Sequence, residues 1–417
     1  MWGFKMSDQT LQNKTNLKFG LALGGGGPLG GIYEIGALRA LDEALDGLDF
    51  NDLHTYVGVN AGSFVAANLA NQMTPAQMCR IFVRNEADVH PFHPAVFYKP
   101  AFSEYMQRAK GVPKILFKAW MNLLSHPNDQ SVLESLTVLA HAVPSGVFDN
   151  EGFHQYVARS YNAIGRTNDF KQLRKSLIVI AADLESGETV RFGSDGLQHI
   201  QISKAIQCSM ASPGLYRPVE IDDHFYVDGT LNKGMHTSVA LDDGADIVFA
   251  INPVVPIDVS QAVDSGTMSR QELTRSGMPN VLSQAYRTMV HSRLKSGLKN
   301  IRRDYPGKEV LLFEPIRSDA NLYFQSVFSF NARKMMCEQA YQLTRASLRA
   351  RAQEMEALLA PAGVRLRHDI LNDETRTLST GLYGAAIPTY QLRNKKIVSM
   401  KKPENYLEKV SKAVSIF

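Results

Sequence analysis

Residues 54–70 read His54-Thr55-Tyr56-Val57-Gly58-Val59-Asn60-Ala61-Gly62-Ser63-Phe64-Val65-Ala66-Ala67-Asn68-Leu69-Ala70. The opening residues favour a β-strand, and the small residues from Phe64 onward follow the turn as a helix. In a nucleophile elbow, glycines stand two residues before and after the central one, because its backbone is strained and larger neighbours would block the helix and the substrate. The stretch therefore predicts a strand, a tight turn and a helix, with Asn60 where such turns present a catalytic serine.

A second strand and helix, joined by a glycine run, lie upstream. Apolar residues alternate over residues 17–23, which predicts a strand, and recur at helical spacing over residues 32–41. Between them stands Gly24-Gly25-Gly26-Gly27-Pro28-Leu29-Gly30-Gly31. Such a run presents backbone N–H groups at the positive end of a helix, which suits an anion. That anion can be a phosphate or the oxyanion of an acyl-transfer transition state.

Two other interpretations of the glycine run are open. Gly25, Gly27 and Gly30 fit the G-x-G-x-x-G pattern of a dinucleotide site. That site needs an acidic residue at the end of the next strand, and here the strand ends in Val59-Asn60 without a carboxylate. The nucleotide interpretation is therefore disfavoured. A glycine-rich turn that holds no ligand is the second alternative.

A third segment, Tyr226-Val227-Asp228-Gly229-Thr230-Leu231-Asn232, places an aspartate at the end of an apolar strand. On its own this is a common turn. It gains weight from the segment before it, Ser209-Met210-Ala211-Ser212-Pro213-Gly214-Leu215-Tyr216-Arg217-Pro218-Val219-Glu220-Ile221.

In this order, the three segments resemble the patatin-like phospholipase family. Residues 146–149, 182–188 and 211–213 also look like stretches of that family, and the resemblance covers roughly residues 17–255. It implies an α/β fold: a patatin-type three-layer α/β/α sandwich with a mostly parallel central sheet, here followed by a helical C-terminal extension.

The resemblance also implies a serine–aspartate dyad that hydrolyses acyl esters of lipids without a cofactor or metal. Asn60 matches the nucleophile and Asp228 the base. The oxyanion loop matches Gly25, Gly26 and Gly27, and the glycines that support the motifs are Gly30, Gly58, Gly62 and Gly229. Two further departures are Leu29, where the family usually has Arg or Lys, and Thr230, where it has Gly or Ala.

The asparagine changes the expected chemistry. Its amide has no proton that Asp228 can remove near neutral pH, and losing a nucleophile costs on the order of a millionfold in turnover. Asparagine tolerates positive φ, and its NH₂ group can donate to Asp228, so the fold should persist. Ser63 is the nearest other hydroxyl, but we expect it to cap or pack in the first helical turn. With the resemblance, this implies a lipid acyl hydrolase that Asn60 impairs or silences, or a non-catalytic relative that binds lipid or a partner.

The chain has 417 residues, 44% of them hydrophobic, which allows one large α/β domain and an extension. We expect a polar leader (residues 1–16), a patatin-like domain (17–255) with an insertion near 85–150, and a mostly helical extension with a basic tail (256–417). The leader lacks the apolar stretch of a signal peptide. Cys79, Cys208 and Cys337 lack metal or redox spacing, which favours thiols in a reducing compartment. His90 and His93 lack a third metal ligand.

Basic residues gather in residues 287–303 and 393–402, although the net charge is only +4. These patches suit anionic lipid headgroups, but a solvated helix face and a basic tail explain them equally well. Residues 112–124 are strongly apolar and predict either a lid or membrane-surface helix, or a buried core helix. No motif supports nucleic-acid binding. We expect a cytoplasmic protein with peripheral contact at the inner membrane surface.

Overall fold

The computed structural model describes residues 17–86, 92, 94–97, 99–100, 145–194, 196–275, 277–318 and 330–383. The chain forms two compact units, Met1–Leu378 and Ser379–Phe417. The central sheet and the predicted site lie in the first unit. Within the second, the described residues 379–383 belong to helix α16 (Leu378–Tyr383).

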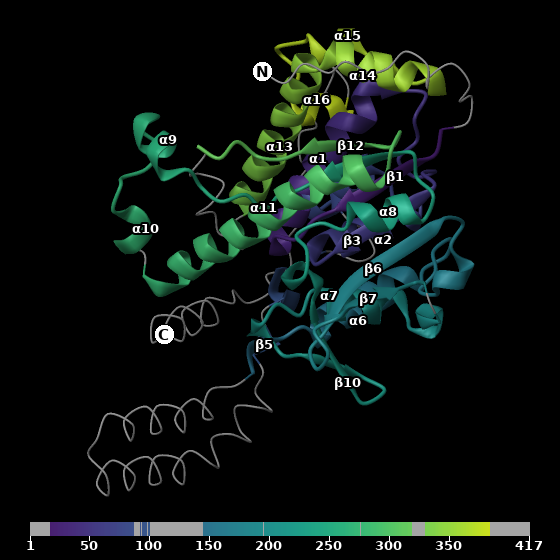
Figure 1. Cartoon of the computed structure of the whole chain (residues 1–417), viewed down its shortest axis with the longest axis vertical. Coiled ribbons are helices and arrows are strands. Elements are labelled where there is room, and N and C mark those ends of the chain that lie inside the picture. The colour runs from purple at the N-terminus through teal and green to yellow at the C-terminus, as the bar shows by residue number, and fades with distance from the viewer. Residues whose placement is uncertain are drawn as a thin grey trace, which may run out of the picture. The chain divides into compact units, whose positions relative to one another are not determined.

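An eight-stranded sheet forms the centre of the first unit, with the order β12-β11-β1-β3-β6-β10-β9 and with β7 paired to β6 (Figure 1). The parallel strands are β1 (Phe19–Leu23), β3 (Thr55–Val59), β6 (Ser176–Asp183), β11 (Ile247–Ile251) and β12 (Glu309–Phe313). The antiparallel pairings involve β7 (Thr189–Phe192), β9 (Val219–Ile221) and β10 (His224–Asp228). Strand β3, which leads to Asn60, is buried along its whole length between β1 and β6.

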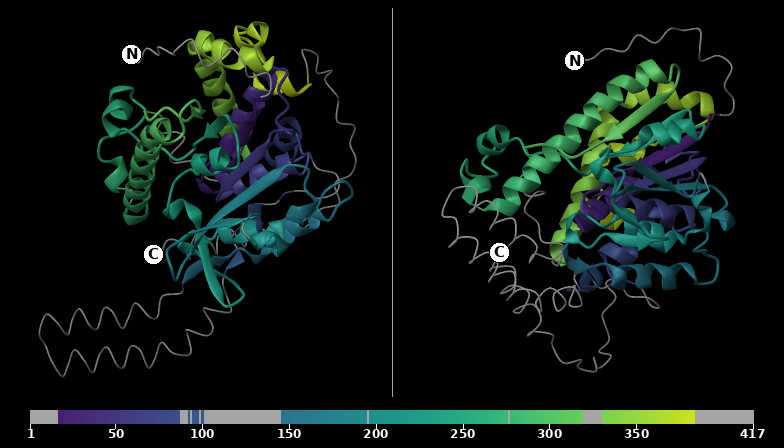
Figure 2. Two further views of the ribbon diagram at one scale, coloured as in Figure 1. Left: turned by 45° about the vertical axis from the view of Figure 1, so that its right-hand side comes forward. Right: turned by 60° about the horizontal axis from the view of Figure 1, so that its bottom comes forward.

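Helices cover both faces of this sheet (Figure 2). The helices α1 (Gly27–Ala44), α2 (Ala61–Ala70) and α7 (Ile202–Ser209) pack on one side, with α13 (Phe330–Ala350) against α1. The helices α8 (Thr237–Asp242) and α11 (Met278–Asp304) close the other face around a core that includes Ala22, Val57 and Ala250. The predicted three-layer α/β/α architecture with a mostly parallel sheet is confirmed.

Shorter elements connect these layers. The remaining strands are β2 (Leu45–Asp46), which pairs with β13 (Arg365–Leu366), and β4 (Lys99–Pro100), β5 (Gly146–Asp149) and β8 (Gly214–Tyr216), which form a small sheet. Within the described ranges, the remaining α-helices are α3 (Pro75–Met78), α6 (Glu151–Tyr161), α9 (Val259–Asp264), α10 (Glu272–Arg275), α14 (Ala352–Leu359) and α15 (His368–Leu371). A single π-helical turn, η1 (Cys79–Val83), follows α3. Because β12 pairs with β11, the sheet extends past the predicted boundary at residue 255.

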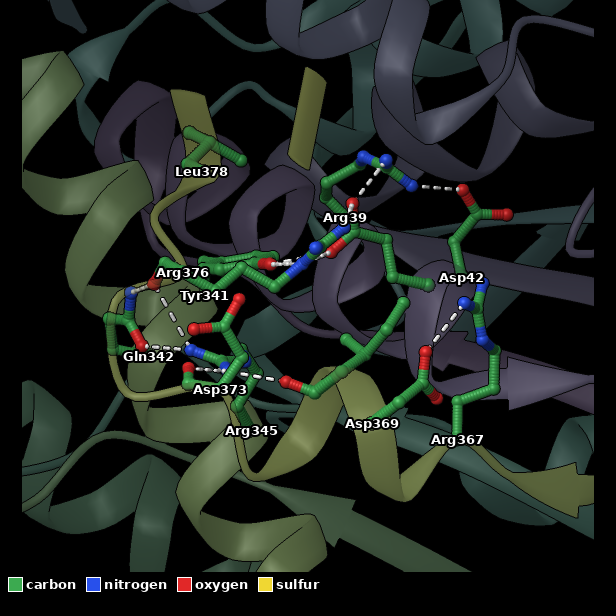
Figure 3. Close-up of polar contacts among 12 residues, drawn as sticks. Arg39, Asp42, Tyr341, Gln342, Arg345, Arg367, Asp369, Asp373, Arg376 and Leu378 are labelled. Atoms are coloured by element: carbon green, nitrogen blue, oxygen red, sulfur yellow. Dashed lines mark hydrogen bonds and ion pairs between the residues drawn. The ribbon is translucent and has the colours of Figure 1, made fainter. Parts of the chain in front are cut away.

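A buried polar cluster fastens the C-terminal helices to α1 (Figure 3). The Glu43 carboxylate accepts hydrogen bonds from Tyr341 Oη (2.5 Å) and from two nitrogens of Arg376 (3.0 and 3.1 Å). The buried Arg345 guanidinium donates to the carbonyl oxygens of Ile370 (2.6 Å) and Asp373 (2.7 Å). Buried charges are tolerated only when they are paired and hydrogen-bonded in this way, so the cluster fixes how these segments dock.

Several sequence predictions lie outside the described residues: the leader, the centre of the insertion with residues 112–124, the His90–His93 pair and the basic tail. Among the helices that are described, none is long and apolar enough to span a membrane. The three cysteines are buried and free.

Candidate active site

Asn60 stands alone in a sharp turn between β3 and α2. Its φ of 55° and ψ of −125° match the first central position of a type II′ turn, which glycine normally occupies. A Cβ on Gly58 would lie 2.5 Å from Ser63 Cα, and one on Gly62 would lie 2.7 Å from the Leu23 carbonyl carbon. The two flanking glycines are therefore required by close backbone approach, as the sequence predicted.

The backbone of Asn60 is held in this conformation by neighbouring elements. Its N–H donates to Ser209 Oγ (2.8 Å), and Ser209 Oγ donates to the carbonyl of Ile180 (2.5 Å). Gly62 N donates to Gly24 O across the turn (3.1 Å). The φ of Asn60 is positive, as expected for this turn. Its ψ of −125° nevertheless lies outside the left-handed helical region in which asparagine is well tolerated, so these hydrogen bonds, and not the preference of asparagine, hold the conformation.

The side-chain oxygen of Asn60 occupies the point where the glycine loop meets α2. Oδ1 accepts hydrogen bonds from Gly27 N (2.9 Å) and from Ala61 N (2.7 Å). In hydrolases with a nucleophile elbow, the oxyanion is bound by the N–H after the nucleophile together with an N–H from another loop. The asparagine amide oxygen therefore sits where a substrate oxyanion would be bound.

Two of the three predicted oxyanion glycines lie against Asn60. Gly26 and Gly27 have φ values of 118° and 61°, which turn the loop so that Gly27 N faces Asn60. A Cβ on Gly30 would lie 2.7 Å from Gly25 O, and a Cβ on Gly25 would lie 3.4 Å from the Asn60 Cβ. The loop thus brings Gly25 and Gly27 against Asn60, whereas Gly26 is exposed at the outer side of the turn.

The other end of the amide contacts Asp228. Asn60 Nδ2 donates to Asp228 Oδ2 at 2.6 Å, which is the contact that the sequence predicted between residues 168 positions apart. The second carboxylate oxygen accepts from Thr230 N (3.0 Å) and Thr230 Oγ1 (2.8 Å). Asp228 is 2% exposed, and this burial raises the pKa of its carboxyl, while the hydrogen bonds from Ser212, Thr230 and Asn60 act in the opposite direction.

Residues behind Asp228 fix the strand end. The Thr230 hydroxyl is hydrogen-bonded to Tyr286 Oη on α11. Burial lowers the pKa of His236 to about 4, so this imidazole is neutral near neutral pH and can donate through Nε2 to Gly229 O (3.4 Å). A Cβ on Gly229 would lie 2.9 Å from Ile180 O, which explains the glycine after the aspartate.

Ser63, the alternative hydroxyl, is fully buried in the first turn of α2. Its Oγ donates to the carbonyl of Asn60 at 2.5 Å. The proton of Ser63 is therefore directed at the backbone of the turn, not at Asp228.

The sequence interpretation missed several residues around the site. The segment that contains Ser209 and Ser212 gives no sequence signal for the contacts that their hydroxyls make with Asn60 and Asp228. The N–H of Ala61 as an oxyanion donor could have been inferred, because Ala61 directly follows the elbow residue. Tyr286 had no sequence signal. Arg287 and Arg317 line a pocket together with Leu29 and Gly26, so basic side chains from α11 and from the segment after β12 approach the loop where the family's usual basic residue is missing.

A small apolar cavity of about 30 Å³ lies beside the elbow, with Pro28 and Ala61 among its lining residues. The rest of its lining is largely aliphatic and aromatic and comprises Gly31, Ile32, Ile35, Phe64, Val65, Phe82, Phe92, Phe97, Met210 and Arg333. The lining has the chemistry that suits an acyl chain, but the space is about that of one water molecule, so a chain fits only if lining side chains move.

A possible metal-binding group lies at the outer ends of β6 and β10. The ligand atoms of Asp183, Glu185 and His224 are within 4.8 Å of one another. Glu185 and His224 are exposed, and acidic groups of this kind are common on protein surfaces without an ion.

Comparison with known proteins places these observations in a family. The family model of patatin-like phospholipases matches residues 21–241. Among solved structures, VipD from Legionella pneumophila is similar at a TM-score of 0.36 and 14% identity, over 81% of this chain and 67% of VipD. The type III effector ExoU, from Pseudomonas aeruginosa, is similar at a TM-score of 0.35 and 16% identity. That match covers 81% of this chain and 53% of ExoU, so the chain spans about half the length of that protein.

Proposed function

The chain belongs to the patatin-like phospholipase family, and from this premise we propose that its site accepts acyl esters of lipids but does not hydrolyse them by the family's serine route. One observation carries the proposal. The carboxamide of Asn60 contacts both the base and the oxyanion donors of the site, through Nδ2 to Asp228 and through Oδ1 to Gly27 N and Ala61 N. The Asn60 side chain therefore occupies both the position of the nucleophile and the position that the substrate's oxyanion would take in the transition state.

On the family's route, the serine hydroxyl gives its proton to the aspartate as its oxygen attacks the ester carbonyl. The loop amides then stabilise the oxyanion of the tetrahedral intermediate. Here the group that position 60 presents to Asp228 is an amide N–H, which is not a usable acid near neutral pH, and the loop amides already have an acceptor. Both losses act on the same step, so we expect turnover by this route to fall by on the order of a millionfold.

A binding function without catalysis is the second candidate. It is supported by the apolar cavity beside Asn60, with Ile32, Phe64 and Phe82 among its lining residues. Its apolar lining suits an acyl chain whether or not the neighbouring turn carries a nucleophile, and its volume of about 30 Å³ requires lining side chains to move as the chain enters. On this candidate, the asparagine stabilises a lipid-binding shape and no reaction follows.

We also propose that helix α11 binds the cytoplasmic face of a membrane that contains anionic lipids. The N-terminal half of this helix exposes Met278 (72%), Leu282 (59%) and Met289 (53%), which recur at helical spacing on one side. The C-terminal half exposes basic side chains: Arg293, Lys295, Lys299, Arg302 and Arg303. Exposed apolar side chains followed by cationic ones match an interface of acyl chains and anionic headgroups.

Ester hydrolysis by matched variants tests the catalytic part of the proposal. The unmodified protein should show almost no turnover of p-nitrophenyl esters, whereas Asn60→Ser should gain orders of magnitude because it restores the hydroxyl and frees the loop amides. Asn60→Ala frees the amides without a hydroxyl and is the control. Robust turnover by the unmodified protein would contradict the silent site, and equal inactivity of all three proteins would favour the binding candidate.

Vesicle co-sedimentation tests the membrane part. Binding to vesicles that contain anionic lipid should exceed binding to neutral vesicles and should weaken as salt rises. Leu282→Glu should reduce it, whereas Ile164→Glu, at a fully exposed apolar residue outside α11, should not. Binding that ignores lipid charge, or that both variants lower equally, would remove α11 as the docking helix.

A further inference from the structure

Ser212 brings a second hydroxyl to the carboxylate of Asp228. Its Oγ donates to Asp228 Oδ2 at 2.6 Å, to the same oxygen that accepts from Asn60 Nδ2. A hydroxyl in this relation to a carboxylate is the arrangement by which an aspartate can remove the proton of a serine nucleophile. Ser212 is half-buried, whereas Ser63 is fully buried, so Ser212 is the hydroxyl with access from outside.

The backbone holds Ser212 and Asp228 in fixed register. The carbonyl of Ser212 accepts from the N–H groups of Leu215 (3.1 Å) and Tyr216 (2.9 Å), which close a turn around it. Asp228 N donates to the carbonyl of Ala211 (3.1 Å), so the residue before Ser212 is tied to the end of β10. The short contact between hydroxyl and carboxylate is therefore maintained by main-chain hydrogen bonds.

Asn60 lies where it can assist a reaction at Ser212. Its Nδ2 is 3.1 Å from Ser212 Oγ, so an amide donor stands beside the oxygen that would attack. A hydrogen bond to the ionised form of a group favours that form, so this N–H favours transfer of the Ser212 proton to Asp228. The amide that blocks the family's route is thus placed as a donor to the Ser212 hydroxyl, which shares one oxygen of Asp228 with it.

We propose that Ser212 is a displaced nucleophile that takes an acyl or phosphonyl group from an activated substrate, with Asp228 as its base and Asn60 as a hydrogen-bond donor to the attacking oxygen. The assignment rests on the proposed lipid-ester site for its substrate class. With an ester, Ser212 Oγ forms a bond to the carbonyl carbon, its proton passes to Asp228, and the alcohol leaves with that proton. The acyl group stays on Ser212, so this step releases one equivalent of alcohol and gives no continued turnover. With a phosphonyl fluoride, the Oγ–P bond forms, fluoride leaves and the proton again passes to Asp228.

A fluorophosphonate probe tests this on the unmodified protein. Intact-mass analysis should show one added phosphonyl group, and peptide mapping should place it on Ser212. Because the map is made on the unmodified chain, its answer does not depend on whether a variant folds. Labelling should be lost in Ser212→Ala and should fall at least tenfold in Asp228→Asn, whereas Ser203→Ala, at a serine that contacts Asn168 instead, should label as the parent does.

A label mapped to Ser212 that depends on Asp228 would support the assignment. A label on Ser63 or on any other residue, labelling of Ser212 that is indifferent to Asp228→Asn, or no label at all would overturn the assignment. None of these results bears on the ester hydrolysis gained by Asn60→Ser. Failure of that gain would in turn leave a mapped label on Ser212 standing, so the two proposals fail separately.

Discussion

Replacing Asn60 by aspartate should turn the stabilising contact with Asp228 into a repulsion that lowers the free energy of unfolding as the pH rises. The substitution keeps the shape of the side chain, and one of its oxygens can still accept from Gly27 N and Ala61 N. The other oxygen takes the place of Nδ2, 2.6 Å from Asp228 Oδ2. Two carboxylates at this separation cannot both be ionised, so the folded variant must hold a shared proton that the unfolded chain releases.

The size of the effect follows from proton linkage. The shared proton raises the folded pKa of the pair above the unfolded value of about 3.9. The stability from that proton is fully present below pH 4 and is lost as the pH rises toward the folded pKa, by about 1.4 kcal/mol per pH unit. Relative to the unmodified protein, Asn60→Asp should therefore be nearly neutral at pH 4 and destabilised by up to about 4 kcal/mol at pH 7.

Urea unfolding of the parent and of Asn60→Asp at several pH values between 4.5 and 8 measures this difference directly. Asn300→Asp, which adds the same charge at an exposed position of α11, is the matched control and should give a flat difference. If the stability difference for Asn60→Asp did not change with pH, the amide of Asn60 would not be the donor to Asp228, and the site geometry argued above would be wrong.

Three further predictions follow from burial and backbone approach. Burial lowers the pKa of His236 to about 4, so the contribution of its neutral imidazole to the free energy of unfolding is fully present above pH 6.5. That free energy should decline by up to about 3 kcal/mol as the pH falls toward 4, and His236→Gln should flatten the decline in urea unfolding. Gly62→Ala should lower the melting temperature severely because its Cβ would overlap the backbone of β1, whereas Gly297→Ala in α11 meets no neighbouring atom and should be neutral or stabilising. In Asn60→Ser, the rate of ester hydrolysis should fall as the pH is lowered, with a midpoint above 3.8, the ordinary pKa of an aspartate, because burial raises the pKa of Asp228. A midpoint at or below 3.8 would contradict the buried base.

The parts of the site that the sequence predicted depend on short local patterns of residues. The strand, turn and helix around Asn60 follow from residue types within a dozen positions, and the flanking glycines have a steric reason that the structure bears out. The contact between Asn60 and Asp228 was reachable because the order of motifs resembled a family in which the corresponding residues meet.

Tertiary approach decided the parts that the sequence did not predict. The amide oxygen of Asn60 faces the glycine loop because tertiary structure brings a donor, Gly27 N, to one end of the amide and an acceptor, Asp228, to the other. The hydroxyl of Ser212 reaches Asp228 only because β10 is tied to the turn before Pro213, and Tyr286 arrives from α11, far along the chain. None of these approaches leaves a periodic pattern in the sequence.

The Asp228 carboxylate, 2.6 Å from Asn60 Nδ2, should serve as the base for a hydroxyl at position 60. The rate of p-nitrophenyl ester hydrolysis by Asn60→Ser, measured beside Asn60→Ser with Asp228→Asn and with thermal unfolding of both, tests this placement. We expect Asn60→Ser to be active and the added Asp228→Asn to abolish the activity while the melting temperature stays near that of Asn60→Ser, because the shape remains and the proton acceptor is lost. Activity that persists without the Asp228 carboxylate would show that another base serves the turn and that Asp228 does not.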